Sequence, residues 1–179
     1  LLGKQDGYLG NEAVKVLLPS GLKNMEPTLR RLGLGPKIDE FVLSMNRAAE
    51  KAAPLAADIF SSAITGISFD AAQKIQKGGP TAATEHLKGA TYTQLLDIFK
   101  PAVTRAMNEY DVTKKYEELM GQVKGVPMLN SLTGKLDLGG YVSGKALDGL
   151  FKVLGEQEAD IRANPAARVT GLLKQVFNK

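Results

Sequence analysis

The sequence contains no cysteine and no tryptophan, and it has one histidine among its 179 residues. The lack of cysteine excludes disulfides, thiolate nucleophiles and cysteine-bound zinc, and it fits a cytoplasmic or a periplasmic protein equally well. A long apolar run is also missing, since no window approaches the roughly 18 consecutive apolar residues that a membrane span requires. We therefore expect no transmembrane segment and no cysteine chemistry.

The motifs that usually accompany catalysis are also missing. His86 stands beside Glu85, without the H-E-x-x-H spacing of a zinc site and without the G-x-S-x-G turn of a serine hydrolase. The run Gly139–Ala146 has the glycine spacing of a phosphate-binding loop, but Ala146 replaces the magnesium-binding Ser or Thr. We therefore predict no catalytic residue, no metal site and no cofactor.

Charge is modest and spread along the chain. The formal net charge is +4, and the 23 lysines and arginines form no stripe of the kind that nucleic-acid binders present. Hydrophobic residues make up 44% of the sequence, which is ordinary for a globular protein. We expect residues 1–179 to form one helical domain that does not bind nucleic acid. The opening Leu1-Leu2-Gly3 reads like the tail of a helix, so we expect a missing upstream segment.

Helical periodicity dominates from Pro36 onward and predicts an all-α, irregular multi-helix bundle. The central helix should run from Pro36 to Gly66 with a kink or break at Pro54, because an internal proline removes a backbone hydrogen bond. Further helices are expected at 81–88, from Thr91 with a kink at Pro101, from Ser143 to Asn164, and beyond Pro165. Residues 13–19 should form an extended arm over the helices, and the glycine-rich stretch 121–140 should be a loop.

Polar residues interrupt two of the expected apolar helices. Asn46, Arg47 and Glu50 lie in the central helix, with Arg47 and Glu50 spaced to share one face. Asp148 and Gly149 interrupt the apolar run 146–151 in the same way. These residues are a structural network that fixes the helix register, plain surface, or the lining of a pocket between helices. We expect Arg47, Glu50 and Asp148 to share one network, because buried charges require partners. Gly149 should allow a close helix contact or room for a ligand.

Several segments resemble an uncharacterised family of mostly bacterial exported proteins, domain of unknown function 4197. The resemblance rests on motifs spread in order along the chain: Ala13–Pro19, Asn46–Glu50 with Pro54, Gly78–Gly79 with Ala82–Thr84, Lys145–Phe151, and Asn164–Arg168 with Leu172–Lys174. It implies a helical fold, export through a signal peptide to the periplasm or outside the cell, and a missing N-terminal helix. It implies no activity. With Arg168 from the last motif, the predicted binding residues are Asn46, Arg47, Glu50, Asp148 and Arg168.

These observations favour a non-enzymatic binding protein of the cell envelope. Its kinked helices should enclose an apolar cleft for a lipid-like ligand or a peptide of a partner protein. A hydrolase centred on His86 is one alternative, and a scaffold protein without a pocket is another. An enclosed apolar cavity would distinguish the first from the last, and a serine or carboxylate bonded to His86 would favour the hydrolase.

Overall fold

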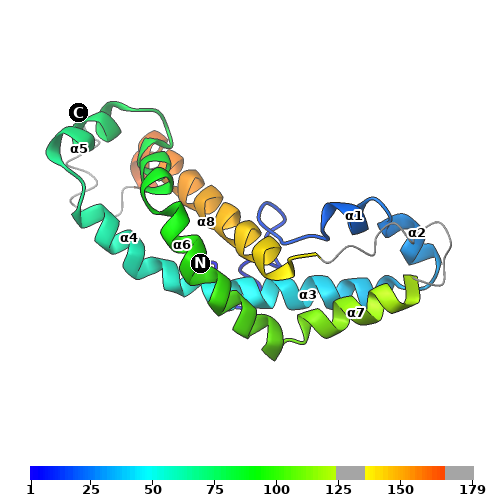
Figure 1. The fold of residues 1–179 in the computed structure, drawn as a ribbon. Coiled ribbons are helices and arrows are strands. Elements are labelled where there is room, and N and C mark those ends of the chain that lie inside the picture. The colour runs from blue at the N-terminus through cyan, green and yellow to red at the C-terminus, as the bar shows by residue number, and fades with distance from the viewer. Residues whose placement is uncertain (124–135, 168–179) are drawn as a thin grey trace.

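The computed structural model describes residues 1–123 and 136–167, and this part of the chain contains helices and no β-strand. Figure 1 shows their arrangement. The elements are α1 (Ser20–Lys23), α2 (Glu26–Arg31), α3 (Gly35–Ala52), the 3-10 turn η1 (Ala53–Leu55), α4 (Ala56–Thr65), α5 (Phe69–Lys77), α6 (Ala82–Glu109), α7 (Val112–Val123), α8 (Leu138–Ala163) and the 3-10 turn η3 (Pro165–Ala167). The predicted all-α fold is confirmed.

The central helix is interrupted where the sequence predicts. Helix α3 ends at Ala52, the turn η1 contains Pro54, and α4 continues in nearly the same direction (Figure 1). Proline is tolerated at the start of a helical turn, where its missing N–H has no partner to lose. The inward face of α3 carries fully buried Ile38, Phe41 and Met45. Helix α3 is thereby the element against which α6, α7 and α8 pack.

Helix α6 corrects one prediction. Two helices divided near Gly89 were expected, but a single helix of 28 residues passes through both Gly89 and Pro101. A glycine inside a helix costs only about 1 kcal/mol relative to alanine. The long contacts of α6 with α8 and α3, which bury Leu95, Phe99 and Val103, exceed that cost. Tertiary packing therefore overrides the local signal.

Helix α8 begins earlier than predicted. Asp137 accepts a hydrogen bond from the Gly140 backbone N–H at 2.8 Å and caps a helix that starts at Leu138. The predicted cap, Ser143, is instead fully buried inside the helix. The glycines at 139 and 140 thus belong to a first helical turn, and the described residues just before them, 136 and 137, form no strand. At the other end of the predicted loop, residues 121–123 belong to α7, so the loop is shorter than expected on both sides. Residues 124–135 and most of the predicted last helix lie outside the described residues.

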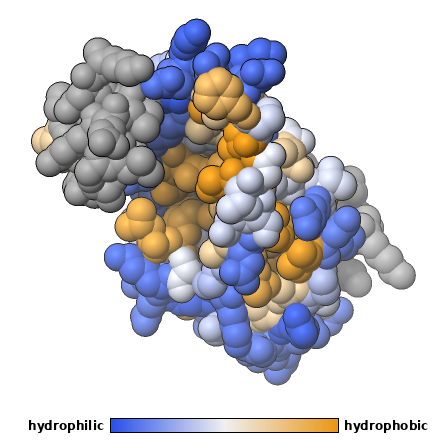
Figure 2. All heavy atoms as spheres, turned by 90° about the vertical axis from the view of Figure 1, so that its left-hand side faces the viewer, coloured by the Kyte–Doolittle hydropathy of each residue, from blue (hydrophilic) through white to orange (hydrophobic). Residues whose placement is uncertain are grey.

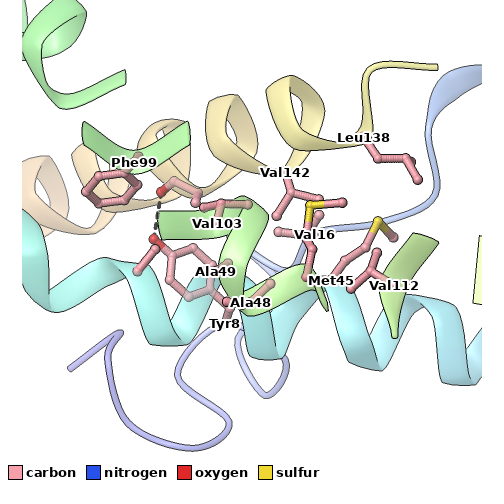
Figure 3. Packing of buried hydrophobic residues seen from close by; sticks show 14 of the residues in the cluster. Tyr8, Val16, Met45, Ala48, Ala49, Phe99, Val103, Val112, Leu138 and Val142 are labelled. Atoms are coloured by element: carbon pink, nitrogen blue, oxygen red, sulfur yellow. Dashed lines mark hydrogen bonds between the residues drawn. The ribbon is translucent and has the colours of Figure 1, made fainter. Parts of the chain in front are cut away.

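The first nineteen residues form an irregular arm of turns and extended chain that packs on the helices. Val16 is fully buried, as is Tyr8, and Figure 3 shows both among side chains of α3, α6 and α8. The expected extended segment over the helices is therefore present at residues 15–19, whereas residues 13 and 14 belong to a turn. We call residues 2–18 the N-terminal arm.

The end of the molecule that carries α4 and α5 differs from this packed centre. Helix α5 contains no buried residue. Figure 2 views this end and shows apolar surface gathered in a hollow between polar regions. No single helix in residues 1–123 and 136–167 is long and apolar enough to span a membrane. Two consecutive helical segments are long and apolar enough only when they are taken together, and a bend of 107° separates them: Gly35–Thr65 and Phe69–Lys77.

Candidate functional site

Glu50 is the centre of the polar contacts on α3. Its Oε1 accepts hydrogen bonds from the backbone N–H groups of Tyr8 and Leu9 at 3.1 and 3.2 Å, and its side chain is 6% exposed. Its Oε2 pairs with Arg47 at 2.6 Å. Because both carboxylate oxygens have donors, the buried charge is well compensated. We call Arg47 and Glu50 the α3 clamp.

Arg47 extends the α3 clamp to the start of the arm. Its second amino group contacts Asp6 at 2.8 Å, where Asp6 has a φ of 61°, a left-handed conformation that aspartate tolerates. The hydrogen bond to Glu50 is the main cause that raises the pKa of Arg47, so the guanidinium stays charged. The α3 clamp therefore fixes a tight turn of the arm against α3.

Asn46 binds the arm further along the chain. Its Oδ1 accepts from the Val16 N–H, and its Nδ2 donates to the carbonyls of Val16 and Val42, all at 2.8 Å. The side-chain amide thus pairs with an extended residue as a neighbouring strand would. Asn46 is fully buried, and removal of this amide would leave buried backbone groups without partners.

The arm approaches α8 closely at Gly149. A Cβ atom added there would lie 2.9 Å from Tyr8 Cε1 and 3.0 Å from Val14 Cβ. The Tyr8 hydroxyl donates to the Ala146 carbonyl at 2.6 Å (Figure 3). Burial, and secondarily the charge of Glu50, raises the pKa of Tyr8, so this hydroxyl remains a donor. Of the two roles expected for Gly149, the geometry shows the close contact.

The structure brings three of the predicted binding residues together. Asn46, Arg47 and Glu50 all hold the N-terminal arm. The prediction that Asp148 shares their network is wrong: Asp148 is exposed on α8 and lies against Tyr92, whose pKa is raised by burial and then by this carboxylate. The reason is that Ala146 and Gly149 face the arm, so Asp148, which precedes Gly149 on α8, points to the surface. Arg168 lies outside the described residues.

A groove of about 450 Å³ opens between the arm and α8, with Asp148 at its edge. Apolar side chains line part of it, among them Val14 and Leu17, and Leu17 is 42% exposed. Tyr141 also lines it and donates its hydroxyl to the Leu17 carbonyl at 2.8 Å. The arm that the α3 clamp and Asn46 hold in place is therefore one wall of this groove.

Four lysines also line the groove, so we call it the lysine groove: Lys15, Lys23, Lys145 and Lys152. Lys15 pairs with Glu12 at 3.3 Å, whereas the other three have no ion-pair partner among the described residues. Asp148 is the one carboxylate in the lining. Unpaired amines around a concave, partly apolar surface suit a ligand with a negative charge and an apolar portion.

The sequence carried part of this signal. Lys145, Asp148 and Lys152 follow one another at spacings of three and four, so they share one face of α8. Lys15 and Lys23 lie more than a hundred residues earlier in the chain, and no helical pattern connects them to α8. Only the three-dimensional placement of the arm, with Lys15, and of α1, with Lys23, brings the two pairs of lysines together.

A second acidic and basic pair occupies the far end of α8. Glu158 accepts hydrogen bonds from the N–H groups of Ala83 and Thr84 at 2.9 and 2.8 Å and so satisfies the first turn of α6. Arg162 pairs with Glu158 at 2.8 Å and donates to the Ile75 carbonyl at the end of α5. We call Glu158 and Arg162 the α8 clamp. Burial alone would raise the pKa of Glu158, but the hydrogen bonds from the backbone, from Thr84 and from Arg162 outweigh it and lower that pKa.

His86 has no catalytic surroundings in the part of the chain that the structure describes. It is exposed on α6 and lines a groove between α5 and α6 together with Ser68 and Asp70. No hydrogen bond joins His86 to a serine or a carboxylate among these residues, and the Ser68 hydroxyl accepts from the Ala71 N–H as the cap of α5. Likewise, residues 1–123 and 136–167 hold no group of three or more metal-ligating side chains.

The fold and the lysine groove define an all-α protein with an amphipathic surface groove and no recognisable catalytic arrangement in its described part. A family model described as "Protein of unknown function (DUF4197)" matches residues 1–178, and the chain belongs to this family. No curated protein and no solved structure matches the chain significantly.

Proposed function

We propose that this chain is a non-enzymatic binding protein whose lysine groove takes an anionic, lipid-like ligand. The observation that carries the proposal is the lining of the groove: three lysines with no ion-pair partner in the described part of the chain stand beside exposed Leu17 and half-buried Tyr141. The amines would hold a phosphate or carboxylate head group, and the apolar side chains would contact an alkyl tail. The lipid-like ligand expected from the sequence is retained, with an anionic head group added.

The construction of the groove supports this proposal. One wall is the N-terminal arm, which has no regular secondary structure, and its position depends on side chains of α3 that are nearly or fully buried. Pre-arranged walls reduce the entropy lost on binding. The buried polar residues that the sequence singled out then have an indirect role: they position the wall that carries Lys15.

The direct test is calorimetric titration with dodecyl phosphate, with dodecyl maltoside as a ligand of equal chain length and no charge. We expect saturable binding of the phosphate that weakens as salt concentration rises, because screening acts on exposed charges. The double variant Lys145→Gln/Lys152→Gln should bind at least about tenfold more weakly, since two charge-assisted contacts are lost. Lys114→Gln, on α7 and away from the groove, is the matched control and should bind as the wild type does.

Three outcomes would contradict the proposal. The first is the absence of dodecyl phosphate binding. The second is equal binding of the maltoside, which would mean that the lysines do not recognise charge. The third is an equal loss of affinity in Lys114→Gln, which would mean that binding depends on the net charge of the protein and not on the lysines of the groove. Binding of an acidic peptide but not of the alkyl phosphate would replace the lipid-like ligand with a partner protein.

We also propose a location in the cell envelope, periplasmic or secreted. The support is the resemblance of the chain's motifs to exported proteins. Fractionation of the native host with an antibody against this chain tests it, together with sequencing of the mature N-terminus. Export predicts recovery outside the cytoplasm, and recovery with cytoplasmic markers would refute it.

A further inference from the structure

Phe69 is the most exposed large apolar side chain within the helices that the structure describes, with 76% of its surface open. It is the first residue of α5, just after the 107° bend that turns α5 away from the line of α3 and α4. Ile64, at the end of α4, is 54% exposed on the other side of this bend. Neither side chain contributes much to the packed core, so the fold itself does not explain them.

The exposed side of α5 has a defined composition. Phe69, Gln73 and Lys77 follow at intervals of four, so they share one face of the helix. Half-buried Ala71 and Ile75 lie on the opposite face, toward the rest of the protein. The outward face of α5 therefore presents an aromatic ring at one end and a lysine at the other.

The charges on α5 are arranged with the acid first and the bases last. Asp70 is in the first turn, and Lys74 and Lys77 are in the last. None of the three forms an ion pair with another described residue. A helix with this distribution is complementary to a second copy of itself that runs in the opposite direction, because each acidic end then meets a basic end.

We propose that two copies of this chain associate through α5 in an antiparallel contact with two-fold symmetry. In this arrangement Gln73 lies at the symmetry axis, and Phe69 packs on the methylene stem of Lys77 of the second copy. The ammonium group of that lysine reaches Asp70. Long basic side chains commonly cover apolar surface with their stems while the charge remains in a polar environment. The contact is small and therefore weak and reversible.

This interface shares no residue with the lysine groove, so it is independent of the proposed ligand. Its test is sedimentation equilibrium of the full chain over a wide range of protein concentration. We expect a monomer–dimer equilibrium, with association at least about tenfold weaker in Phe69→Ser, since exposed aromatic anchors dominate small interfaces. Leu32→Ser is the matched control, because Leu32 is 52% exposed beyond the end of α2. It should leave the equilibrium unchanged.

Charge reversal gives a sharper test of the antiparallel register. Asp70→Lys alone and Lys77→Asp alone should each dissociate the dimer, because like charges then face each other across the axis. An equimolar mixture of the two variants should associate again, because each opposed pair becomes a lysine facing an aspartate. Circular dichroism should show unchanged helix content in every variant, since all of these side chains are exposed.

The proposal fails if the wild type is a monomer at every concentration, or if the mixture of the two reversed chains remains monomeric. Dimerisation that survives Phe69→Ser would place the interface elsewhere. The same variants are added to vesicles of phosphatidylglycerol and phosphatidylcholine. If Phe69→Ser abolishes vesicle binding while the wild type stays monomeric, α5 contacts a lipid surface, and the two-copy interface is wrong.

Discussion

Two glutamate–arginine pairs stabilise this fold, and they bind different kinds of backbone. The α8 clamp satisfies the first backbone N–H groups of α6, which a helix always leaves without internal partners. The α3 clamp satisfies N–H groups of an arm that has no regular secondary structure. The α8 clamp completes an element that sequence periodicity already specifies, whereas the α3 clamp creates order where no local pattern would produce it.

The difference shows where buried charge is required. Helix α6 has other sources of stability, because it is long and packs along both α8 and α3. The N-terminal arm depends on side chains from outside itself: Glu50 and Asn46 bind its backbone, and Arg47 pairs with the side chain of Asp6. Loss of the α3 clamp should therefore release a wall of the lysine groove, while loss of the α8 clamp should loosen helix ends remote from it.

The largest effect should come from Glu50→Ala. It leaves the N–H groups of Tyr8 and Leu9 without an acceptor and Arg47 without its buried partner. We expect a loss of about 3–5 kcal/mol in the free energy of unfolding, the range for removal of one member of a buried pair. Urea denaturation followed by circular dichroism measures it. A loss under about 1 kcal/mol would show that the arm contributes no more than surface pairs do.

Gly149→Ala should have the next largest effect. The added methyl group meets Tyr8 and Val14 at distances that demand movement of the arm. Overpacking of this kind typically costs about 1–3 kcal/mol. Gly144→Ala, one and a half turns earlier on the same helix, is the matched control, because nothing lies within 4 Å of the added atom. It should stabilise the protein by about 0.5–1 kcal/mol through helix propensity. Equal effects of the two substitutions would contradict the close contact at Gly149.

Glu158→Gln should lower the free energy of unfolding by about 1–2 kcal/mol at neutral pH, the range for loss of a helix cap. The pKa of Glu158 is lower in the folded protein than in the unfolded chain. Its stabilising contribution is therefore complete above the unfolded pKa of about 4.3 and is lost as pH falls through the lower folded value. Unfolding measured from pH 7 downward should show the wild type and the variant converging in this acid range. A difference in unfolding free energy between the two proteins that stays constant with pH would mean that the charge of Glu158 does not contribute to stability.

The smallest effect should be the coupling between Arg47 and Asp148. Arg47→Ala leaves Glu50 with its two backbone donors and should cost about 1.5–3 kcal/mol. Asp148→Ala removes an exposed side chain and should change stability by no more than about 0.5 kcal/mol. The stability loss in the double variant should equal the sum of the two single losses within about 0.5 kcal/mol, because the two residues share no partner. A larger coupling energy would restore the network that the sequence suggested and would contradict the separation of the two sites.

Periodicity and proline placement were sufficient to predict much of this fold. The break at Pro54 and the extended arm both follow from local rules. The continuity of α6 did not follow, because the cost of Gly89 is local while the packing that outweighs it is not. The start of α8 was misplaced because Asp137 and Ser143 are both plausible caps, and burial decided between them.

The polar site was also predicted only in part, because local spacing in the sequence does not show tertiary contacts. Arg47 and Glu50 could be paired from their spacing, and Asn46 could be placed beside them. In the arm, Glu50 and Asn46 bind backbone groups, which carry no sequence signature. Arg47 binds the side chain of Asp6, which lies 41 residues away along the chain. Asp148 was assigned to the wrong side of α8 because the chain gives no indication of which face the arm covers. The lysine groove combines residues from both ends of the described chain, so it required the three-dimensional arrangement.

The central claim is that side chains of α3 hold the arm that forms the groove wall. Amide hydrogen exchange at Tyr8, Leu9 and Val16, followed by NMR, tests it most directly, because the acceptors of these amides are Glu50 and Asn46 side chains. In the wild type all three amides should exchange slowly. In Glu50→Ala those of Tyr8 and Leu9 should exchange rapidly, while amides in the middle of α6, near Phe99, remain protected. Equal protection of Tyr8 and Leu9 in both proteins would contradict the account.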